Sequence, residues 1–167
     1  MNSLESLRQE FSQEAATTKR VLDRIPEDKL AWKPHDKSMS LGQLALHLAS
    51  VPGAIAKITK PDAFDVSRNN FNPPMPKDMS EVYAALEQSI RDVEQTFKET
   101  SEETAQAQWH LMMADKELMS LPRTSAWRSL MLNHWYHHRG QLSVYLRILD
   151  VPVPSIYGPS ADESPFA

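Results

Sequence analysis

The chain of 167 residues is 41% hydrophobic and 24% charged, a composition typical of one globular domain with a buried core. Its net charge of −4 and its lack of long basic runs argue against binding to nucleic acid. The sequence has no cysteine, so disulfides and cysteine nucleophiles are excluded. No hydrophobic segment approaches the ~20 residues that span a membrane, and we expect a cytoplasmic protein with no membrane partner.

Apolar residues recur at helical spacing in four parts of the chain. The predicted helices cover residues 4–25, 40–58, 78–100 and 124–150. Pro26 ends the first helix, and Ser40 with Gln43 matches a capping box at the start of the second. We therefore predict an all-α fold, a four-helix bundle built from a single domain of residues 1–167.

Two segments between the predicted helices have other patterns. Residues 60–77 form a long loop rich in proline and asparagine, which allows a crossover between the second and third helices. Residues 109–121 alternate weakly between apolar and polar side chains and could form a short hairpin.

Three of the six histidines fall within one stretch of five residues, 134–138, in the fourth predicted helix. A wheel at about 100° per residue gives an apolar face of Trp127, Leu130, Met131, Leu142, Tyr145, Ile148 and Leu149, and a polar face of Arg128, Ser129, Tyr136, Arg139, Ser143 and Arg147. His134 and His138 lie within the apolar face, and His137 lies at its edge. Side chains four residues apart on a helix have Cβ atoms about 5–6 Å apart, so these two imidazoles could bind one ion.

His47, in the second predicted helix, also points toward the bundle interior. Burying three imidazoles without partners would cost roughly several kcal/mol of desolvation, and a shared cation removes that cost. We therefore predict a metal site with His47, His134 and His138 as ligands. The alternative is that these histidines only pack in the core.

The predicted ligands limit which metals could bind and which kind of site they could form. Three nitrogen ligands without a thiolate suit zinc, nickel, iron or copper. Three protein ligands leave a position for water or substrate, as in catalytic sites. Gln141 is the best candidate to hydrogen-bond a metal-bound water, and His137 is a candidate for a supporting role at the rim. Gln141 could instead only fill polar space in the core.

The chain resembles the DinB family of bacterial proteins, within the DinB/YfiT-like superfamily of metal-dependent enzymes, in three segments: NHWYHHRGQLSVYLRILDVPVPSIYGPSADE (133–163), SMSLGQLALHLA (38–49) and KELMSLPR (116–123). The resemblance implies an up-down-down-up bundle. It implies a divalent metal, commonly nickel or zinc, bound by His47, His134 and His138. It also implies a homodimer.

Three functions follow from these observations. The first is a metal-dependent enzyme whose ion activates water or a low-molecular-weight thiol for transfer or hydrolysis of a small-molecule substrate. The thiol is implied by the resemblance, because characterised relatives in the superfamily are thiol-dependent transferases and isomerases. The second is a non-catalytic bundle that a metal stabilises, and the third is a bundle that binds a small organic molecule. The family is named for induction by DNA damage, so a stress-related role belongs with the alternatives.

The tail after the last predicted helix, residues 151–167, is rich in proline and has no helical period. Its prolines favour an extended path. It could cover the metal pocket as a flap, with Asp162 or Glu163 near the site. It could instead lie along the bundle and cover apolar surface.

Overall fold

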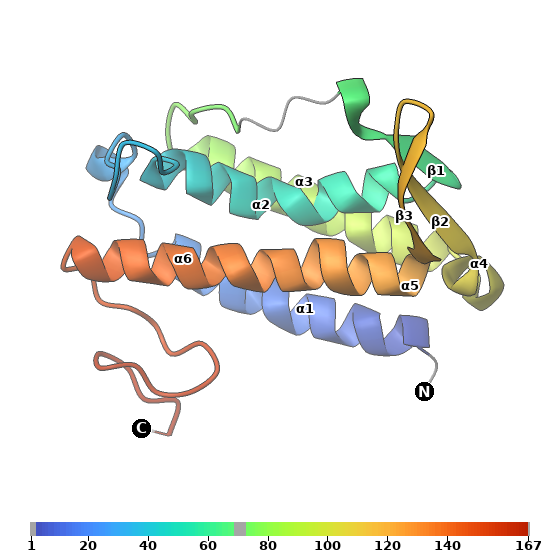
Figure 1. Ribbon diagram of the computed structural model, residues 1–167. Helices are drawn as coiled ribbons and strands as arrows, with labels where there is room; N and C mark the ends of the chain where they lie inside the picture. The colour runs from blue at the N-terminus through green and yellow to red at the C-terminus, as the bar shows by residue number, and fades with distance from the viewer. Residues whose placement is uncertain (1–2, 69–72, 167) are drawn as a thin grey trace.

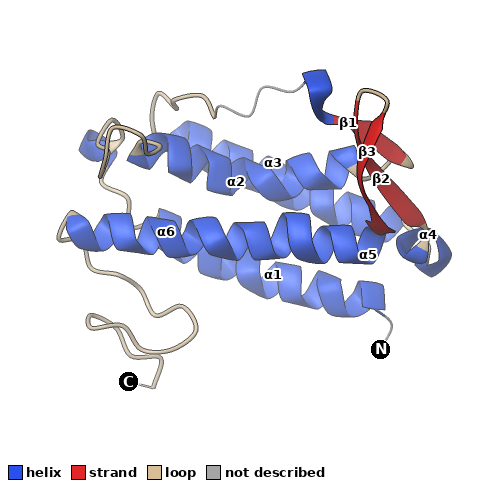
Figure 2. Cartoon of the chain, in the orientation of Figure 1, coloured by secondary structure: helices blue, strands red, loops and turns tan. Residues whose placement is uncertain are grey.

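The computed structural model describes residues 3–68 and 73–166 of the protein. It is mainly helical, with a small three-stranded sheet at one end of the long helices (Figure 1, Figure 2). The long helices are α1 (Ser3–Leu22), α2 (Leu41–Ile58), α3 (Met79–Glu99) and α6 (His134–Ile148), and the short ones are α4 (Glu102–Gln106) and α5 (Arg123–Ala126). The strands are β1 (Ala63–Asp65), β2 (Gln108–Met113) and β3 (Lys116–Pro122), and short 3-10 turns cover Glu27–Lys29 and Val66–Arg68.

Side-chain caps determine where α2 and α3 begin. Ser40 Oγ accepts a hydrogen bond from the Gln43 backbone N–H at 3.1 Å, and Gln43 Oε1 accepts one from the Ser40 N–H at 3.0 Å. The predicted capping box is therefore confirmed. At the start of α3, the Asp78 carboxylate accepts hydrogen bonds from the N–H groups of Ser80 and Glu81.

The fourth predicted helix is a continuous helical run whose geometry changes along its length. α5 is followed by a π-helix, Trp127–Asn133, and then by α6. A π-helix has more residues per turn than an α-helix, so a wheel at a constant 100° per residue loses its phase here. Arg139, predicted on the polar face, is only 1% exposed, whereas Ile148, predicted on the apolar face, is 55% exposed. Both wheel assignments were wrong.

The small sheet corrects the expectation of an all-α fold. β2 pairs antiparallel with β3, which confirms the hairpin predicted in residues 109–121. β1 pairs parallel with β2 and adds an edge strand. With only three residues, β1 is too short to show alternation in the sequence. Parallel strands need a crossover connection, and the chain through α3 and α4 provides it.

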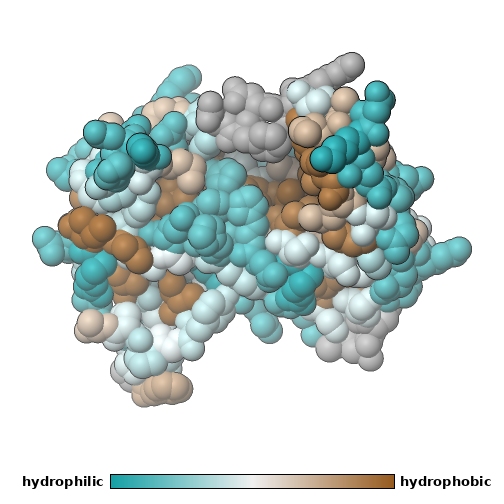
Figure 3. Space-filling view, viewed as in Figure 1, coloured by the Kyte–Doolittle hydropathy of each residue, from teal (hydrophilic) through white to brown (hydrophobic). Residues whose placement is uncertain are grey.

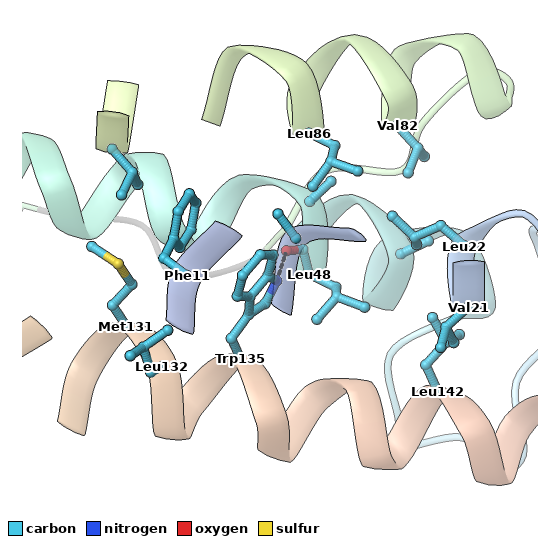
Figure 4. Close-up of a cluster of buried hydrophobic side chains, with 14 of the residues drawn as sticks. Phe11, Val21, Leu22, Leu48, Val82, Leu86, Met131, Leu132, Trp135 and Leu142 are labelled. Atoms are coloured by element: carbon cyan, nitrogen blue, oxygen red, sulfur yellow. Dashed lines mark hydrogen bonds between the residues drawn. The ribbon is translucent and has the colours of Figure 1, made fainter. Parts of the chain in front are cut away.

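The long helices lie side by side around a shared apolar core. α2 and α3 both begin far from the sheet and end near it, whereas α1 and α6 run in the opposite direction (Figure 1). Buried side chains from all four helices meet in the core, among them Phe11, Leu48, Leu86 and Trp135 (Figure 4). This packing holds α2 and α6, which carry the predicted ligands, next to each other.

α2 resembles a membrane-crossing helix in length and composition, with a mean hydropathy of 1.2. However, 56% of this segment is buried inside the protein, and the core helix of a globular protein gives the same signal. Among the described residues, 3–68 and 73–166, α2 is the only helix long and apolar enough to give this signal. Its apolar composition is explained by its position in the core.

The tail after α6 lies against α1 and α6. The Asp162 carboxylate pairs with Arg147 of α6, and the Glu163 carboxylate pairs with Arg20 of α1 and with Arg24 in the turn after α1. Both acidic side chains are therefore engaged in ion pairs, and neither belongs to the histidine group described below. The flap interpretation, with these carboxylates near the site, is wrong, and the tail lies along the bundle.

Candidate metal centre

Two helices bring three histidines to one point. His47 comes from α2, and His134 and His138 come from α6, one turn apart. Their Nε2 atoms are 3.4 Å apart for His47 and His134, 3.2 Å for His47 and His138, and 2.7 Å for His134 and His138. His138 is 9% exposed, and the other two rings are partly buried. The structure thus brings together all three predicted ligands.

The distances between these nitrogens are those expected around one small cation. Zinc binds histidine nitrogen at about 2.0–2.1 Å, so two nitrogens at tetrahedral positions lie about 3.3–3.4 Å apart. At the right angles of octahedral coordination, the same bonds separate them by about 2.9 Å. The distances from His47 are close to the tetrahedral value, and the 2.7 Å between His134 and His138 is closer to the octahedral one. The group could therefore hold a divalent metal ion.

Two of the rings make a further hydrogen bond outside the group. His138 Nδ1 lies 2.7 Å from Gln141 Oε1, and the His134 ring is hydrogen-bonded to the Leu130 backbone. A neutral imidazole has one N–H group, so a ring that donates through Nδ1 carries a lone pair on Nε2. In His138 the bond to Gln141 therefore leaves a lone pair on Nε2, which lies 2.7 Å from the Nε2 of His134. A cation bound by both rings would accept a lone pair from each of these nitrogens.

Burial lowers the pKa of all three histidines. The pKa of His47 falls to about 4, first because of burial and then because of the charges that protonated His138 and His134 would carry. Burial also lowers the pKa of His134 and His138, and the hydrogen bonds to Leu130 and Gln141 partly oppose it. At neutral pH the rings are therefore neutral, the form that binds metal.

The other predicted residues lie around the histidine group. Gln141 was predicted to bond a metal-bound water; in the structure its amide oxygen accepts a hydrogen bond from the ring of His138. This is the contact by which a neighbouring side chain fixes the tautomer of a metal-binding imidazole. His137 is exposed, and its ring centre lies 5.0 Å from that of His138, outside the group. On the hairpin, His110 pairs with Glu117.

Sequence reasoning missed two residues beside the histidine group. Arg139 and Trp135 each directly follow a predicted ligand in the sequence, and each is only 1% exposed. Arg139 pairs with Glu14 of α1, and the Trp135 indole donates to the Leu48 carbonyl of α2. These partners lie 125 and 87 residues away in the sequence, so no local pattern could reveal them.

Comparison with known proteins gives consistent results for fold and family. The model of the DinB family matches residues 1–165 of the chain. Over 153 residues the chain is 24% identical to YrdA, an uncharacterized protein of Bacillus subtilis, covering 90% of this chain and 85% of YrdA. A DinB-like protein from Bacillus cereus has a similar structure, with a TM-score of 0.73, 19% identity, and coverage of 92% of this chain and 97% of that one. For the DinB-like protein YjoA of Bacillus subtilis, the TM-score is 0.65 with 20% identity, and coverage is 87% and 92%.

At these identities the structural similarity establishes the fold alone. The family is established separately, because its model matches nearly the whole chain, including both helices that carry the three histidines. The protein belongs to the DinB family.

Proposed function

We propose that this protein is a metal-dependent enzyme whose divalent ion is bound by His47, His134 and His138. The proposal is carried by one observation: three histidine Nε2 atoms from two helices lie within 3.4 Å of one another. The up-down-down-up helix order implied by the family resemblance belongs to the proposal, and the helix directions in Figure 1 support it.

The ligand set favours an open, catalytic site. Among the described residues, the group consists of three histidines, with no carboxylate or cysteine in it. Three protein ligands are typical of catalytic zinc sites, whereas structural sites have four. Nickel or zinc fits these nitrogen ligands best in our proposal, with iron and copper as the other candidates. When bound, such an ion activates water or a thiol for hydrolysis or transfer on a small-molecule substrate.

The protein's own residues prepare the rings for this role. Gln141 holds His138 in the tautomer whose Nε2 is free to bind metal, and the Leu130 backbone hydrogen-bonds the ring of His134. Burial keeps the rings neutral. Since the sequence contains no cysteine, a thiol reactant would have to come from a low-molecular-weight compound.

A cytoplasmic homodimer completes the proposal. Val144 and Ile148 of α6 are 57% and 55% exposed. Figure 3 shows hydrophobic surface at this end of α6 beside largely hydrophilic side chains. An exposed apolar patch is a typical contact surface for a second copy of a chain. Light scattering on the purified protein, compared with a Val144→Lys variant, tests whether α6 forms the contact.

The experiment that tests the metal site is elemental analysis of tag-free protein combined with X-ray absorption spectroscopy. We expect close to one metal ion per chain, about three imidazole ligands, and a solvent ligand. Saturated coordination by protein groups alone would instead favour the non-catalytic alternative. Absence of metal after reconstitution with zinc and nickel would contradict the proposal and favour a bundle that binds an organic molecule.

A further inference from the structure

Pro52 lies inside α2, where it changes the hydrogen bonding of the helix. Proline has no backbone N–H, so the carbonyl four residues earlier loses its usual helical partner. In α2 this is the carbonyl of Leu48, a residue with no exposed surface. A buried carbonyl without a partner is costly, so the chain must provide another donor.

Trp135 of α6 provides that donor. Its indole Nε1 donates to the Leu48 carbonyl at 2.7 Å, as the dashed line in Figure 4 shows. Trp135 is 1% exposed and stacks on Phe11 of α1, with ring centres 5.3 Å apart. The hydrogen bond is therefore shielded from water and connects one side chain to the backbone of another helix.

The position of this hydrogen bond relates it to the metal centre. Leu48 directly follows His47 in α2, and Trp135 directly follows His134 in α6. The bond thus joins the two helices within one residue of a ligand on each side. A shift or rotation of α6 along α2 that moved the ligands apart would also have to break this bond.

A second contact holds the same part of α2 from its other side. The Gly53 N–H donates to Ser89 Oγ of α3 at 2.6 Å. The two backbones approach closely here, because a Cβ atom on Gly53 would lie only 2.8 Å from Ser89 Cα. α2 is therefore fixed against α3 beside Pro52, and Trp135 fixes α6 against α2.

We infer that Trp135 is a positioning residue for the metal centre. By binding the carbonyl that Pro52 leaves free, its indole N–H sets the register of α6 on α2, so that His134 and His138 meet His47. This inference rests on the proposed metal site. It assigns to the Pro52–Trp135 pair a role in metal affinity that is separate from its contribution to stability.

The protein offers a matched control for this inference. Trp127 lies in the same continuous helical run, is also 1% exposed, and also donates its indole N–H, at 2.8 Å to Oγ1 of Thr59, the residue that caps the C-terminal end of α2. Like Trp135 it packs on a phenylalanine, Phe97, with ring centres 5.0 Å apart. Its hydrogen bond, however, lies eleven residues along α2 from Leu48, well away from His47.

The test compares Trp135→Phe with Trp127→Phe by titration of the metal-free proteins with zinc and with cobalt, whose visible absorption reports coordination geometry. Substitutions near metal ligands typically weaken binding about 10–100-fold, and we expect such a loss in Trp135→Phe together with a changed cobalt spectrum. We expect Trp127→Phe to stay within about threefold of the unmodified protein, even though both variants lose a buried hydrogen bond. Equal losses of affinity in the two variants would overturn the inference.

A double variant distinguishes two roles of Trp135: positioning α6 on α2, and providing a hydrogen-bond donor to the buried Leu48 carbonyl. In Pro52→Ala/Trp135→Phe, the new N–H at position 52 can bond the Leu48 carbonyl within α2. We expect thermal stability to recover relative to Trp135→Phe while metal affinity stays low, because the connection to α6 is still missing. Recovery of affinity along with stability would overturn the inference. If the unmodified protein binds no metal, both the proposed function and the inference fail, whereas failure of the comparison alone leaves the metal site standing.

Discussion

Arg139, directly after His138, is buried against α1, where its guanidinium lies 2.5 Å from the carboxylate of Glu14. The guanidinium also donates to the Thr18 hydroxyl at 3.1 Å and to the hydroxyl of Tyr157 in the tail. Adjacent positions of α6 thus face two neighbours, α2 through the histidine and α1 through the arginine.

Loss of one partner of this buried pair should destabilise the fold strongly. Arg139→Met leaves the Glu14 carboxylate without its counterion, and breaking a buried pair in this way costs about 3–5 kcal/mol. Urea denaturation measures the change in the free energy of unfolding. Arg139→Met combined with Glu14→Leu should recover most of the loss, because no unpaired charge then remains. Lys19→Ala, which removes an exposed ion pair with Asp23, is the control and should have little effect. A change below about 1 kcal/mol in Arg139→Met would contradict this account.

Gln141 should tune metal affinity with little effect on stability, because its side chain is exposed and its oxygen bonds His138 Nδ1. Gln141→Ala removes the acceptor that fixes the tautomer, and we expect affinity for zinc to fall about 10–100-fold. Gln141→Glu keeps an acceptor and makes the imidazole more basic, so it should retain or increase affinity. Gln88→Ala, which removes another exposed glutamine on α3, serves as the control. If alanine and glutamate at position 141 gave the same affinity, the hydrogen bond to His138 would have no role in binding.

Alanine substitutions of single histidines should divide into two groups. His47→Ala and His134→Ala each remove a converging Nε2 atom and should abolish stoichiometric metal, measured by elemental analysis. His137→Ala removes an exposed ring outside the group and should retain metal, which makes it the control on the same helix. Equal metal loss in all three variants would contradict the assignment of His47 and His134 as ligands.

The histidine group was predictable because its signals are local and periodic. His134 and His138 form an i, i+4 pair on an apolar helix face, and His47 lies in the helix that Ser40 caps. Each of these positions can be predicted from the sequence of a single helix. The capping box and the hairpin likewise involve residues close in sequence. These features needed no knowledge of how the helices pack.

The features that the sequence did not reveal depend on contacts between distant segments. The helical wheel placed Arg139 on the polar face, and the pairing with Glu14 that allows its burial crosses from α6 to α1. β1 is a strand only because β2 lies beside it. The π-helix before His134 changes the number of residues per turn, which no wheel of fixed period can represent.

Removal of the tail should change stability and leave metal binding intact. A chain ending at Asp150 loses the ion pairs of Asp162 and Glu163 with α6 and α1, together with the buried side chain of Val153. We expect a lower midpoint of thermal unfolding, measured by circular dichroism. Zinc affinity should stay within about threefold of the full-length protein, because these contacts lie outside the histidine group. A loss as large as that expected for Gln141→Ala would contradict the separation of the tail from the histidine group.

The metal-free protein should lose stability as the pH falls from about 6.5 toward 4. The pKa of His47 is about 4 in the folded protein and near 6.5 in a model peptide, so between these values the unfolded chain binds the additional proton. Stability rises with pH wherever the unfolded state binds more protons, and acidification therefore favours unfolding. Burial lowers the pKa of His134 and His138 as well, which adds to the slope in the same direction.

Urea denaturation in the presence of a chelator, at steps between pH 7 and pH 5, measures this slope. Near pH 5 the carboxylates whose pKa is lowered in the fold, such as Glu10 and Asp92, add to the slope in the same direction, so the histidine contribution is measured by comparing variants. His47→Leu should flatten the dependence, because it removes the ring whose pKa is most strongly lowered. His137→Leu, at an exposed position, should leave the slope unchanged. Stability that stays constant from pH 7 to pH 5 in the unmodified protein would show that the three rings titrate as they do in the unfolded chain. The argument that burial keeps these rings neutral for metal binding would then be wrong.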